Sequence, residues 1–241
     1  MADDLKRLQK CWDSWGKKDP LWAILSYKEK KGRKWMIDEF FKTGIKEIQS
    51  VLKYIKSKGI KLNRGKALDF GCGIGRLTQP LAQNFKKAYG VDIAPSMIKL
   101  AKKYNKHGKK CEYILNKADN LKIFKGSSID FIYSHITLQH IKPKYSLKYI
   151  KEFFRILAPN GILLFQIPSK IKNPLYIIFK LYSYFKSLVN LPYMEIHSVK
   201  KKNIVKLAKE NHADIIDIIE TGSVPGYTSY RYCIKKIVTK Q

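Results

Sequence analysis

Short apolar runs and longer amphipathic segments alternate along most of this chain. Runs of apolar residues bounded by turn residues are typical of buried strands, and apolar residues at three- and four-residue steps are typical of helices. The predicted strands are 67–70, 87–92, 111–115, 129–134, 162–167, 213–219 and 230–234, and the predicted helices among them are 77–84, 94–104, 145–157 and 200–211. This alternation predicts an α/β fold, with a doubly wound, mostly parallel sheet that helices cover on both faces.

The first 62 residues precede the predicted sheet and have a helical pattern. A tryptophan-rich start is interrupted at Pro20, and a longer amphipathic helix over 35–58 ends at Gly59 as its C-cap. We expect these helices to cover one side of the sheet. The tryptophan-rich start is also a candidate lid, because aromatic side chains over a pocket exclude water.

Residues 168–198 interrupt the alternation after the fifth predicted strand. Their apolar positions have helical spacing with lysines interspersed, which fits either a cap over a substrate pocket or an amphipathic helix on an anionic membrane. The cap is the favoured interpretation, because ligands of such sheets bind beyond the carboxyl ends of the strands.

The formal net charge of +29 raises the question of a polyanionic partner. Only six of the 48 basic residues are arginine, and lysines occur along the whole chain. Base and phosphate recognition favours the arginine fork, so the charge indicates compositional bias more than nucleic-acid binding. Contact with nucleic acid or with an anionic membrane surface stays open but is not favoured.

The cysteines give no sign of a disulfide framework or a metal site. Four cysteines are widely scattered, and no CxxC or Cys/His spacing suggests zinc. No apolar run approaches the roughly 18 residues of a membrane span, and the N-terminal residues do not resemble a secretory signal. We therefore expect reduced thiols, no metal and a cytoplasmic protein.

The strand predicted over 67–70 runs directly into Gly71, Gly73 and Gly75, and a helix follows. A strand, a tight glycine turn and a helix N-terminus together indicate a nucleotide-cofactor site, because the bare backbone lets a ligand approach closely. A dinucleotide fingerprint would have its third glycine where this chain has Arg76. The spacing therefore disfavours an NAD-dependent oxidoreductase.

Two acidic residues indicate which kind of nucleotide the site would bind. Asp69 immediately precedes the glycine turn, where its charge would repel a pyrophosphate but suit a ligand carrying an ammonium or a sulfonium group. Asp92 closes the second predicted strand, 21 residues after Gly71. A carboxylate there is placed to accept both hydroxyls of a ribose.

The chain at this point resembles the class I S-adenosylmethionine-dependent methyltransferases, of the small type 11/12 kind. The stretches that carry the resemblance are 69–75, 90–97, 118–121, 130–140 and 157–163. They cover residues 60–168 strongly and extend weakly to the C-terminus. The resemblance implies a Rossmann-like, seven-stranded sheet whose last strand is reversed, with N-terminal helices and a helical cap after strand five. It also implies S-adenosylmethionine as the cofactor and S-adenosylhomocysteine as its product.

The resemblance and the spacing together predict the cofactor-binding residues, with Asp92 at the ribose and Asp119 at the adenine amine. The predicted set is Asp69, Gly71, Cys72, Gly73, Gly75, Arg76, Asp92, Ile93, Met97, Ala118, Asp119, Asn120, Ser134 and His135. We predict a single domain over 1–241. Its parts are a helical cover over 1–62, a cofactor-binding core over 63–168, a substrate cap over 169–199, and a C-terminal helix with two strands over 200–241.

A sulfonium methyl is already electrophilic, so the main task of the protein is to place it in line with the acceptor, away from water. A base near a hydroxyl or amine acceptor would help. The candidates are His140, just beyond the fourth strand, His197, at the end of the cap, and His135, which is also interpretable as a lining residue of the cofactor pocket. The first two are equally interpretable as polar residues that bond to the backbone.

The hypothesis for function is transfer of a methyl group to the oxygen or nitrogen of a small-molecule acceptor by in-line displacement. One alternative is an RNA or protein methyltransferase that uses the basic surface, and the other is a non-catalytic scaffold that binds S-adenosylmethionine. The chain has no N-P-P-[YF] motif and no added RNA-binding module. The intact cofactor motifs argue against a scaffold.

Overall fold

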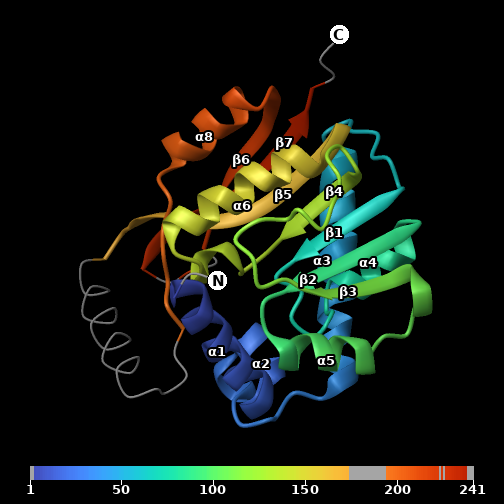
Figure 1. The fold of residues 1–241 in the computed structure, drawn as a ribbon, viewed down its shortest axis with the longest axis vertical. Coiled ribbons are helices and arrows are strands. Elements are labelled where there is room, and N and C mark those ends of the chain that lie inside the picture. Colours follow the sequence, from blue (N-terminus) through green and yellow to red (C-terminus); the bar gives the residue numbers. More distant parts are fainter. Residues whose placement is uncertain (1–2, 174–193, 223, 225, 238–241) are drawn as a thin grey trace.

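A computed structural model describes residues 3–173, 194–222, 224 and 226–237 of the chain (Figure 1). Its sheet has seven strands: β1 (Lys66–Phe70), β2 (Lys87–Asp92), β3 (Cys111–Leu115), β4 (Ile129–Ser134), β5 (Leu157–Ile171), β6 (Ala213–Thr221) and β7 (Tyr227–Lys236). The α-helices are α1 (Asp3–Lys18), α2 (Pro20–Ile24), α3 (Ile37–Ser57), α4 (Thr78–Asn84), α5 (Pro95–Lys103), α6 (Pro143–Ile156) and α8 (Lys201–Glu210). Short 3₁₀ helices are η1 (Lys28–Lys30), η2 (Gly108–Lys110) and η3 (Leu138–His140).

The strand order is β3-β2-β1-β4-β5-β7-β6. The pairs from β3 through β5 are parallel, and β7 runs antiparallel to both β5 and β6. The predicted α/β architecture with a reversed last strand is therefore confirmed. The chain leaves β1 toward β2 and β3 and later returns to the other side of β1 with β4. Such a reversal opens a crevice at the carboxyl ends of the two central strands.

Alternate side chains of the sheet enter two separate hydrophobic cores, as the near-continuous apolar strands predict. On β5, Leu163 and Phe165 pack with α6 and α8 on one face. Ile162 and Leu164 pack on the other face, in a core shared with α3, α4 and α5. Figure 1 shows α6 and α8 in front of the sheet and α3 behind it.

The two N-terminal helices α1 and α2 do not join α3 on the sheet face. They pack with aromatic and aliphatic side chains around Met97 at the start of α5. Asp13 of α1 accepts a hydrogen bond from the backbone N–H of Ser96 at 2.8 Å, and the Ser96 hydroxyl donates to the Asp13 carbonyl at 2.9 Å. Because this carboxylate caps one of the free N–H groups of α5, α1 is held beside the carboxyl edge of the sheet.

Strand β5 is longer than the sequence pattern suggests. It was expected over 162–167 but starts at Leu157, directly after α6. Leu157 pairs with Ile129, and an irregularity that contains Asn160 at φ 60° separates this pair from the next one, Phe131 with Ile162. Antiparallel pairing with the ten-residue β7 extends the other end of β5 to Ile171. Partner strands set these limits, and local apolar patterning does not report them.

Most of the predicted cap, residues 174–193, lies outside the described residues. The stretch 194–199 that follows is tied to the core by two backbone bonds, from His197 N–H to the Gln139 carbonyl at 2.7 Å and from Val199 N–H to the Pro168 carbonyl at 2.9 Å. Among the helices of the described ranges, none has the length and apolarity needed to cross a membrane.

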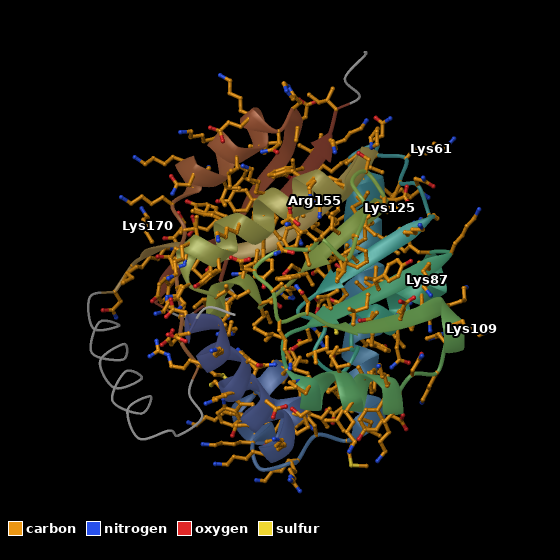
Figure 2. All side chains as sticks on the ribbon, in the orientation of Figure 1. Lys61, Lys87, Lys109, Lys125, Arg155 and Lys170 are labelled. Carbon is orange, nitrogen blue, oxygen red and sulfur yellow. The ribbon has the colours of Figure 1, made fainter. Side chains whose placement is uncertain are left out.

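Basic side chains surround the described part of the molecule. In Figure 2, Lys170 lies on the left of the molecule and Lys61, Lys87, Lys109 and Lys125 lie on the right, on different elements. This distribution agrees with compositional bias and does not single out one face for a polyanion.

Candidate functional site

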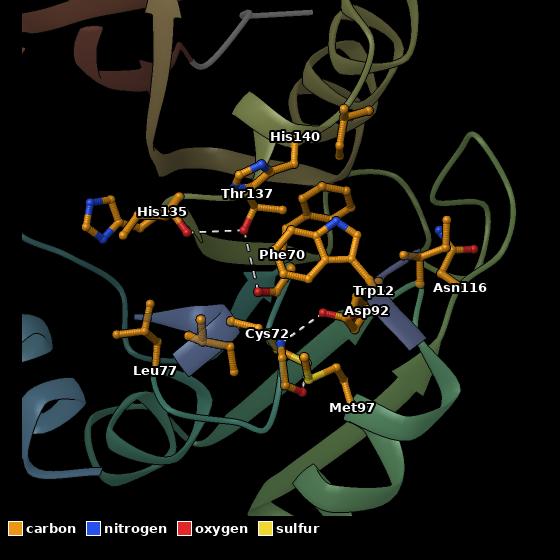
Figure 3. Close-up of a pocket in the computed structure, with 18 of the residues that line it drawn as sticks. Trp12, Phe70, Cys72, Leu77, Asp92, Met97, Asn116, His135, Thr137 and His140 are labelled. Carbon is orange, nitrogen blue, oxygen red and sulfur yellow. Dashed lines mark hydrogen bonds between the residues drawn. The ribbon is translucent and has the colours of Figure 1, made fainter. Parts of the chain in front are cut away.

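A cavity lies at the carboxyl ends of the central strands, where the strand order reverses. Its lining comes from the glycine turn after β1, the end of β2, the residues after β3 and β4, and helices α1, α2 and α6 (Figure 3). The lining residues are Leu8, Trp12, Ala23, Ile24, Phe70, Gly71, Cys72, Gly73, Arg76, Leu77, Val91, Asp92, Ile93, Met97, Asn116, His135, Ile136, Thr137, His140, Ile141 and Tyr149. Nine of the predicted site residues are among them: Gly71, Cys72, Gly73, Arg76, Asp92, Ile93, Met97, His135 and His140.

Gly71, Cys72, Gly73 and Asp92 form one side of the cavity, which we call the glycine wall. Gly71 and Gly73 have φ of 78° and 53°, values that side chains rarely adopt. A Cβ on Gly71 would lie 2.1 Å from Thr137 Cγ2, and one on Gly73 would lie 2.6 Å from Ile24 Cδ1. The wall therefore consists largely of bare backbone pressed against the neighbouring elements.

Asp92 connects this turn to the start of α5. One carboxylate oxygen accepts from the Gly73 N–H at 2.9 Å and the other from the Ala94 N–H at 2.8 Å. Burial raises the pKa of Asp92, although these backbone N–H groups act in the opposite direction. A carboxylate has about four acceptor sites, so Asp92 retains acceptor capacity toward the cavity that it lines.

Asp69 lies beneath the glycine wall and does not line the cavity. Its carboxyl oxygen accepts from the Thr78 hydroxyl at 2.6 Å, at the first residue of α4. Burial raises the pKa of Asp69 to about 7, against the effects of the Thr78 hydroxyl and the Arg76 charge. The geometry gives this acid a contact to the start of α4 in place of the ligand contact expected from its position in the sequence.

A buried group around Glu47 lies at the end of β4. We call Glu47, Arg76, Tyr133 and His135 the Glu47 cluster. Glu47 Oε1 is 2.6 Å from His135 Nδ1 and 2.8 Å from the Tyr133 hydroxyl, and Oε2 is 2.8 Å from Arg76 Nη1. Although burial alone would raise it, these contacts with His135 and Arg76 hold the pKa of Glu47 down to about 2. The sequence motifs did not reveal Glu47; the only signal is an acid beside Ile48 on the buried face of α3.

Trp12, Thr137 and His140 form the opposite side of the cavity, which we call the aromatic wall. Figure 3 shows Thr137 and His140 on the side of the cavity away from Cys72. The Trp12 and His140 rings meet edge to face with centroids 5.0 Å apart. Helix α1 is thus part of the cavity, as the lid hypothesis for the N-terminal segment expects.

Both ring nitrogens of His140 contact other protein groups. Nδ1 is 2.8 Å from the Glu195 carbonyl oxygen, and Nε2 is 3.2 Å from Gln139 Nε2. Because a carbonyl only accepts, Nδ1 carries the hydrogen, and Nε2 accepts from the Gln139 amide. Burial is the main cause that lowers the pKa of His140 to about 4; the Glu195 carbonyl acts against this shift, and nearby His197 acts in the same direction as burial.

His197 is close to this arrangement but does not line the cavity. Its Nε2 is 2.8 Å from Glu195 Oε2, and this contact lowers the pKa of Glu195 despite its partial burial. The structure thus brings His140 and His197 together through Glu195, a residue that the sequence analysis did not identify.

The other predicted site residues lie outside the lining. The Gly75 position faces the Tyr113 hydroxyl, and the Ser134 hydroxyl donates to the Phe70 carbonyl at 3.0 Å. Among residues 118–120, the Asp119 carboxylate is 2.6 Å from Lys148 Nζ on α6.

Asn116 lines the cavity where Asp119 had been expected. Its side-chain amide donates to the carbonyls of Asn120 at 2.9 Å and Ala118 at 3.4 Å, so it organises the loop after β3. It is the first polar residue after that strand and shares the carboxyl edge with Asp92. That position was a usable signal. Among the described residues, no group of three or more His, Cys, Asp or Glu side chains could hold a metal ion.

Comparisons with known proteins agree on the kind of domain. Residues 68–165 match the family model described as a methyltransferase domain. Over 98 residues, 40% of this chain, the sequence is 35% identical to phosphoethanolamine N-methyltransferase of Triticum aestivum, 19% of whose length is covered. It is 28% identical over 125 residues, 51% of this chain, to trans-aconitate 2-methyltransferase of an Enterobacter species, covering 47% of that protein. The chain thus spans less than half the length of these curated relatives.

The fold has solved counterparts over nearly the whole chain. Magnesium protoporphyrin IX methyltransferase from Synechocystis, solved with bound S-adenosylhomocysteine, covers 97% of this chain and is itself fully covered, with a TM-score of 0.67 and 20% identity. A Clostridium acetobutylicum S-adenosylmethionine-dependent methyltransferase covers 90% of this chain with a TM-score of 0.60 and 17% identity. At these identities the likeness establishes the fold.

Proposed function

Because residues 68–165 match the methyltransferase-domain family, we propose that this protein uses S-adenosylmethionine to methylate a small-molecule acceptor. The observation that carries the proposal is that the bare backbone of Gly71 and Gly73 and the carboxylate of Asp92 line one cavity together. A carboxylate with free acceptor capacity beside a bare backbone turn suits a ribose that lies flat on the turn.

The cavity fits the two ends of this cofactor. Asp92 would accept the ribose hydroxyls, and Ile93, Met97 and Asn116 line the part of the cavity nearest the ends of β2 and β3, where the base would lie. Arg76 is buried, and its Nε has no hydrogen-bond partner. A buried guanidinium N–H without a partner is costly, and the carboxylate of the methionyl group would satisfy it.

When bound, S-adenosylmethionine supplies a sulfonium methyl that an oxygen or nitrogen nucleophile displaces in line. The chain contributes placement and exclusion of water. Leu8, Trp12, Ile24 and Ile136 supply apolar surface to the cavity, which keeps water away from the reacting groups. We propose that His140 supports this surface and does not act as a base, because both of its nitrogens are engaged within the protein.

The relatives named above act, by their names, on phosphoethanolamine and trans-aconitate, which are small molecules. This supports a small-molecule acceptor here. The lysines labelled in Figure 2 lie on different elements, a distribution that fits compositional bias better than an RNA-binding face. O- or N-methylation is the proposed chemistry, since a sulfonium methyl needs only a nucleophilic lone pair.

Isothermal titration tests the cofactor assignment. We expect micromolar binding of S-adenosylhomocysteine and none of NADH; the reverse pattern would refute the proposal. Asp92→Ala should weaken S-adenosylhomocysteine binding by about a hundredfold, because two hydroxyls lose a charged acceptor. Asp214→Ala, which removes an exposed acid of β6, is the matched control and should leave the affinity unchanged.

A screen of metabolite extract with methyl-labelled cofactor tests the acceptor class. Label should pass to a compound of low molecular mass when the wild-type protein is added, and not with Asp92→Ala. Transfer only to RNA or to protein in a crude lysate would contradict the small-molecule assignment.

A further inference from the structure

The Glu47 cluster contains more hydrogen bonds than a single structural ion pair would have. One side chain that follows the glycine turn, Arg76, and two at the end of β4, Tyr133 and His135, converge on the Glu47 carboxylate of α3, with all three contacts at 2.6–2.8 Å. Glu47 keeps 20% of its side chain exposed and Arg76 only 4%. Charged hydrogen bonds of this length are among the strong ones, so Glu47 fixes the orientation of its partners.

Arg76 is left with a donor that faces no protein acceptor. Nη1 bonds to Glu47 at 2.8 Å and lies 3.4 Å from the Thr43 hydroxyl, whereas the buried Nε has no partner. Arg76 lines the cavity. An anionic group of a ligand is the natural partner for this N–H, because the guanidinium holds its donors in a rigid fork.

His135 is left with an acceptor. Since a carboxylate only accepts, the contact with Glu47 places a hydrogen on His135 Nδ1, and in the neutral ring the lone pair then lies on Nε2. No partner of that Nε2 is found among the described residues, and His135 and Arg76 both belong to the lining of the cavity. An ammonium group of a ligand can donate to it.

We propose that Glu47 is a positioning residue which orients Arg76 and His135 to recognise the carboxylate and the ammonium of the cofactor's amino-acid end. The inference rests on the proposed function, because it needs a cofactor that carries an α-amino acid. Glu47 lies outside the stretch that matches the family model, residues 68–165. Helix α3 therefore belongs to the cofactor site as well as to the core.

A pair of ligands separates this role from simple packing. S-adenosylhomocysteine carries the amino acid, whereas 5′-methylthioadenosine has the same nucleoside and thioether without it. By isothermal titration the wild-type protein should prefer S-adenosylhomocysteine by about a hundredfold. Glu47→Gln keeps the shape but loses the charge, so it should weaken S-adenosylhomocysteine by about tenfold and leave 5′-methylthioadenosine within about twofold.

Two further variants complete the test. Glu152→Gln changes a glutamate that pairs with Arg155 outside the cavity and should leave both affinities unchanged. Tyr133→Phe removes one hydroxyl donor to Glu47 and should produce the same selective loss at about threefold. If Glu47→Gln does not fold, the two affinities of Tyr133→Phe still test the positioning role of Glu47.

Equal weakening of both ligands by Glu47→Gln would overturn the inference, since that result marks a structural role. So would an unchanged preference for S-adenosylhomocysteine. If the wild-type protein binds both ligands equally, the inference fails while the proposed function stands. If it binds neither ligand, the proposed function itself is refuted, and the inference with it.

Discussion

The glycine wall and the aromatic wall close the same cavity but are built from the chain in different ways. Gly71 and Gly73 directly follow β1 and Asp92 ends β2, the next strand along the chain, and their contacts use the backbone of the turn, as in the bond from Gly73 N–H to the Asp92 carboxylate. The aromatic wall unites Trp12 with His140, and His140 bonds in turn to Glu195.

This difference indicates how the two walls divide their tasks. A wall of backbone presents the same shape whatever the neighbouring side chains are, which suits a constant ligand. A wall of side chains from distant segments changes with each substitution, which suits a variable one. We therefore expect cofactor affinity to depend on the glycine wall and acceptor choice on the aromatic wall.

The largest effect is expected where the two walls touch. Gly71→Ala should destabilise the fold by about 3 kcal/mol, because it combines a side chain at positive φ with a Cβ 2.1 Å from Thr137. Urea unfolding measures the loss, and S-adenosylhomocysteine affinity should fall by at least about tenfold.

Gly59→Ala is the matched control for Gly71→Ala. Gly59 also has positive φ, 68°, but open space around its Cβ position, so the cost should be about 1 kcal/mol with affinity unchanged. Equal losses of stability and affinity in the two variants would show that the contact between Gly71 and Thr137 contributes nothing beyond the cost of positive φ.

An intermediate effect should appear in the pH dependence of the aromatic wall. The folded-state pKa of His140, about 4, lies below its ordinary value of 6.5, so between these values the unfolded chain binds a proton that the folded one does not. The contribution is fully present above pH 6.5 and is lost as the pH falls toward 4, by about 3 kcal/mol.

His140→Gln should reduce this acid-side slope, measured by urea unfolding at pH 7, 5.5 and 4.5. The exposed His212 gives the control His212→Asn, because asparagine tolerates the positive φ of 50° there. The control should keep the wild-type slope. A slope unchanged in His140→Gln would mean that His140 takes up its proton in the folded state.

The smallest effect distinguishes two residues of the loop after β3. Asn116→Ala removes the amide that organises residues 118–120 and should weaken S-adenosylhomocysteine by about tenfold. Asp119→Ala breaks an exposed pair with Lys148 and should change the affinity by about twofold or less. Titration of both variants checks this, and a larger loss in Asp119→Ala would restore that residue to the adenine end.

Much of the fold could be predicted from local pattern, because strands buried on both faces and their helices leave a strong apolar signal. The limits of β5 could not, since they depend on pairing with β7. In the site, Asp92 was recognisable from its spacing to Gly71. The place of Asp69 was not, because the direction of one carboxyl toward Thr78 depends on how α4 packs.

The glycine turn, the acid at the end of β2 and the order of strands and helices can be recognised from the sequence alone, because they depend on residues that are close along the chain. Other contacts can be seen only in the folded structure. Glu47 bonds to Arg76 and His135, and Trp12 and Glu195 both contact His140. Residues far apart in sequence carry no local signal of their contact. Their meeting follows from how helices α1 and α3 pack around the sheet.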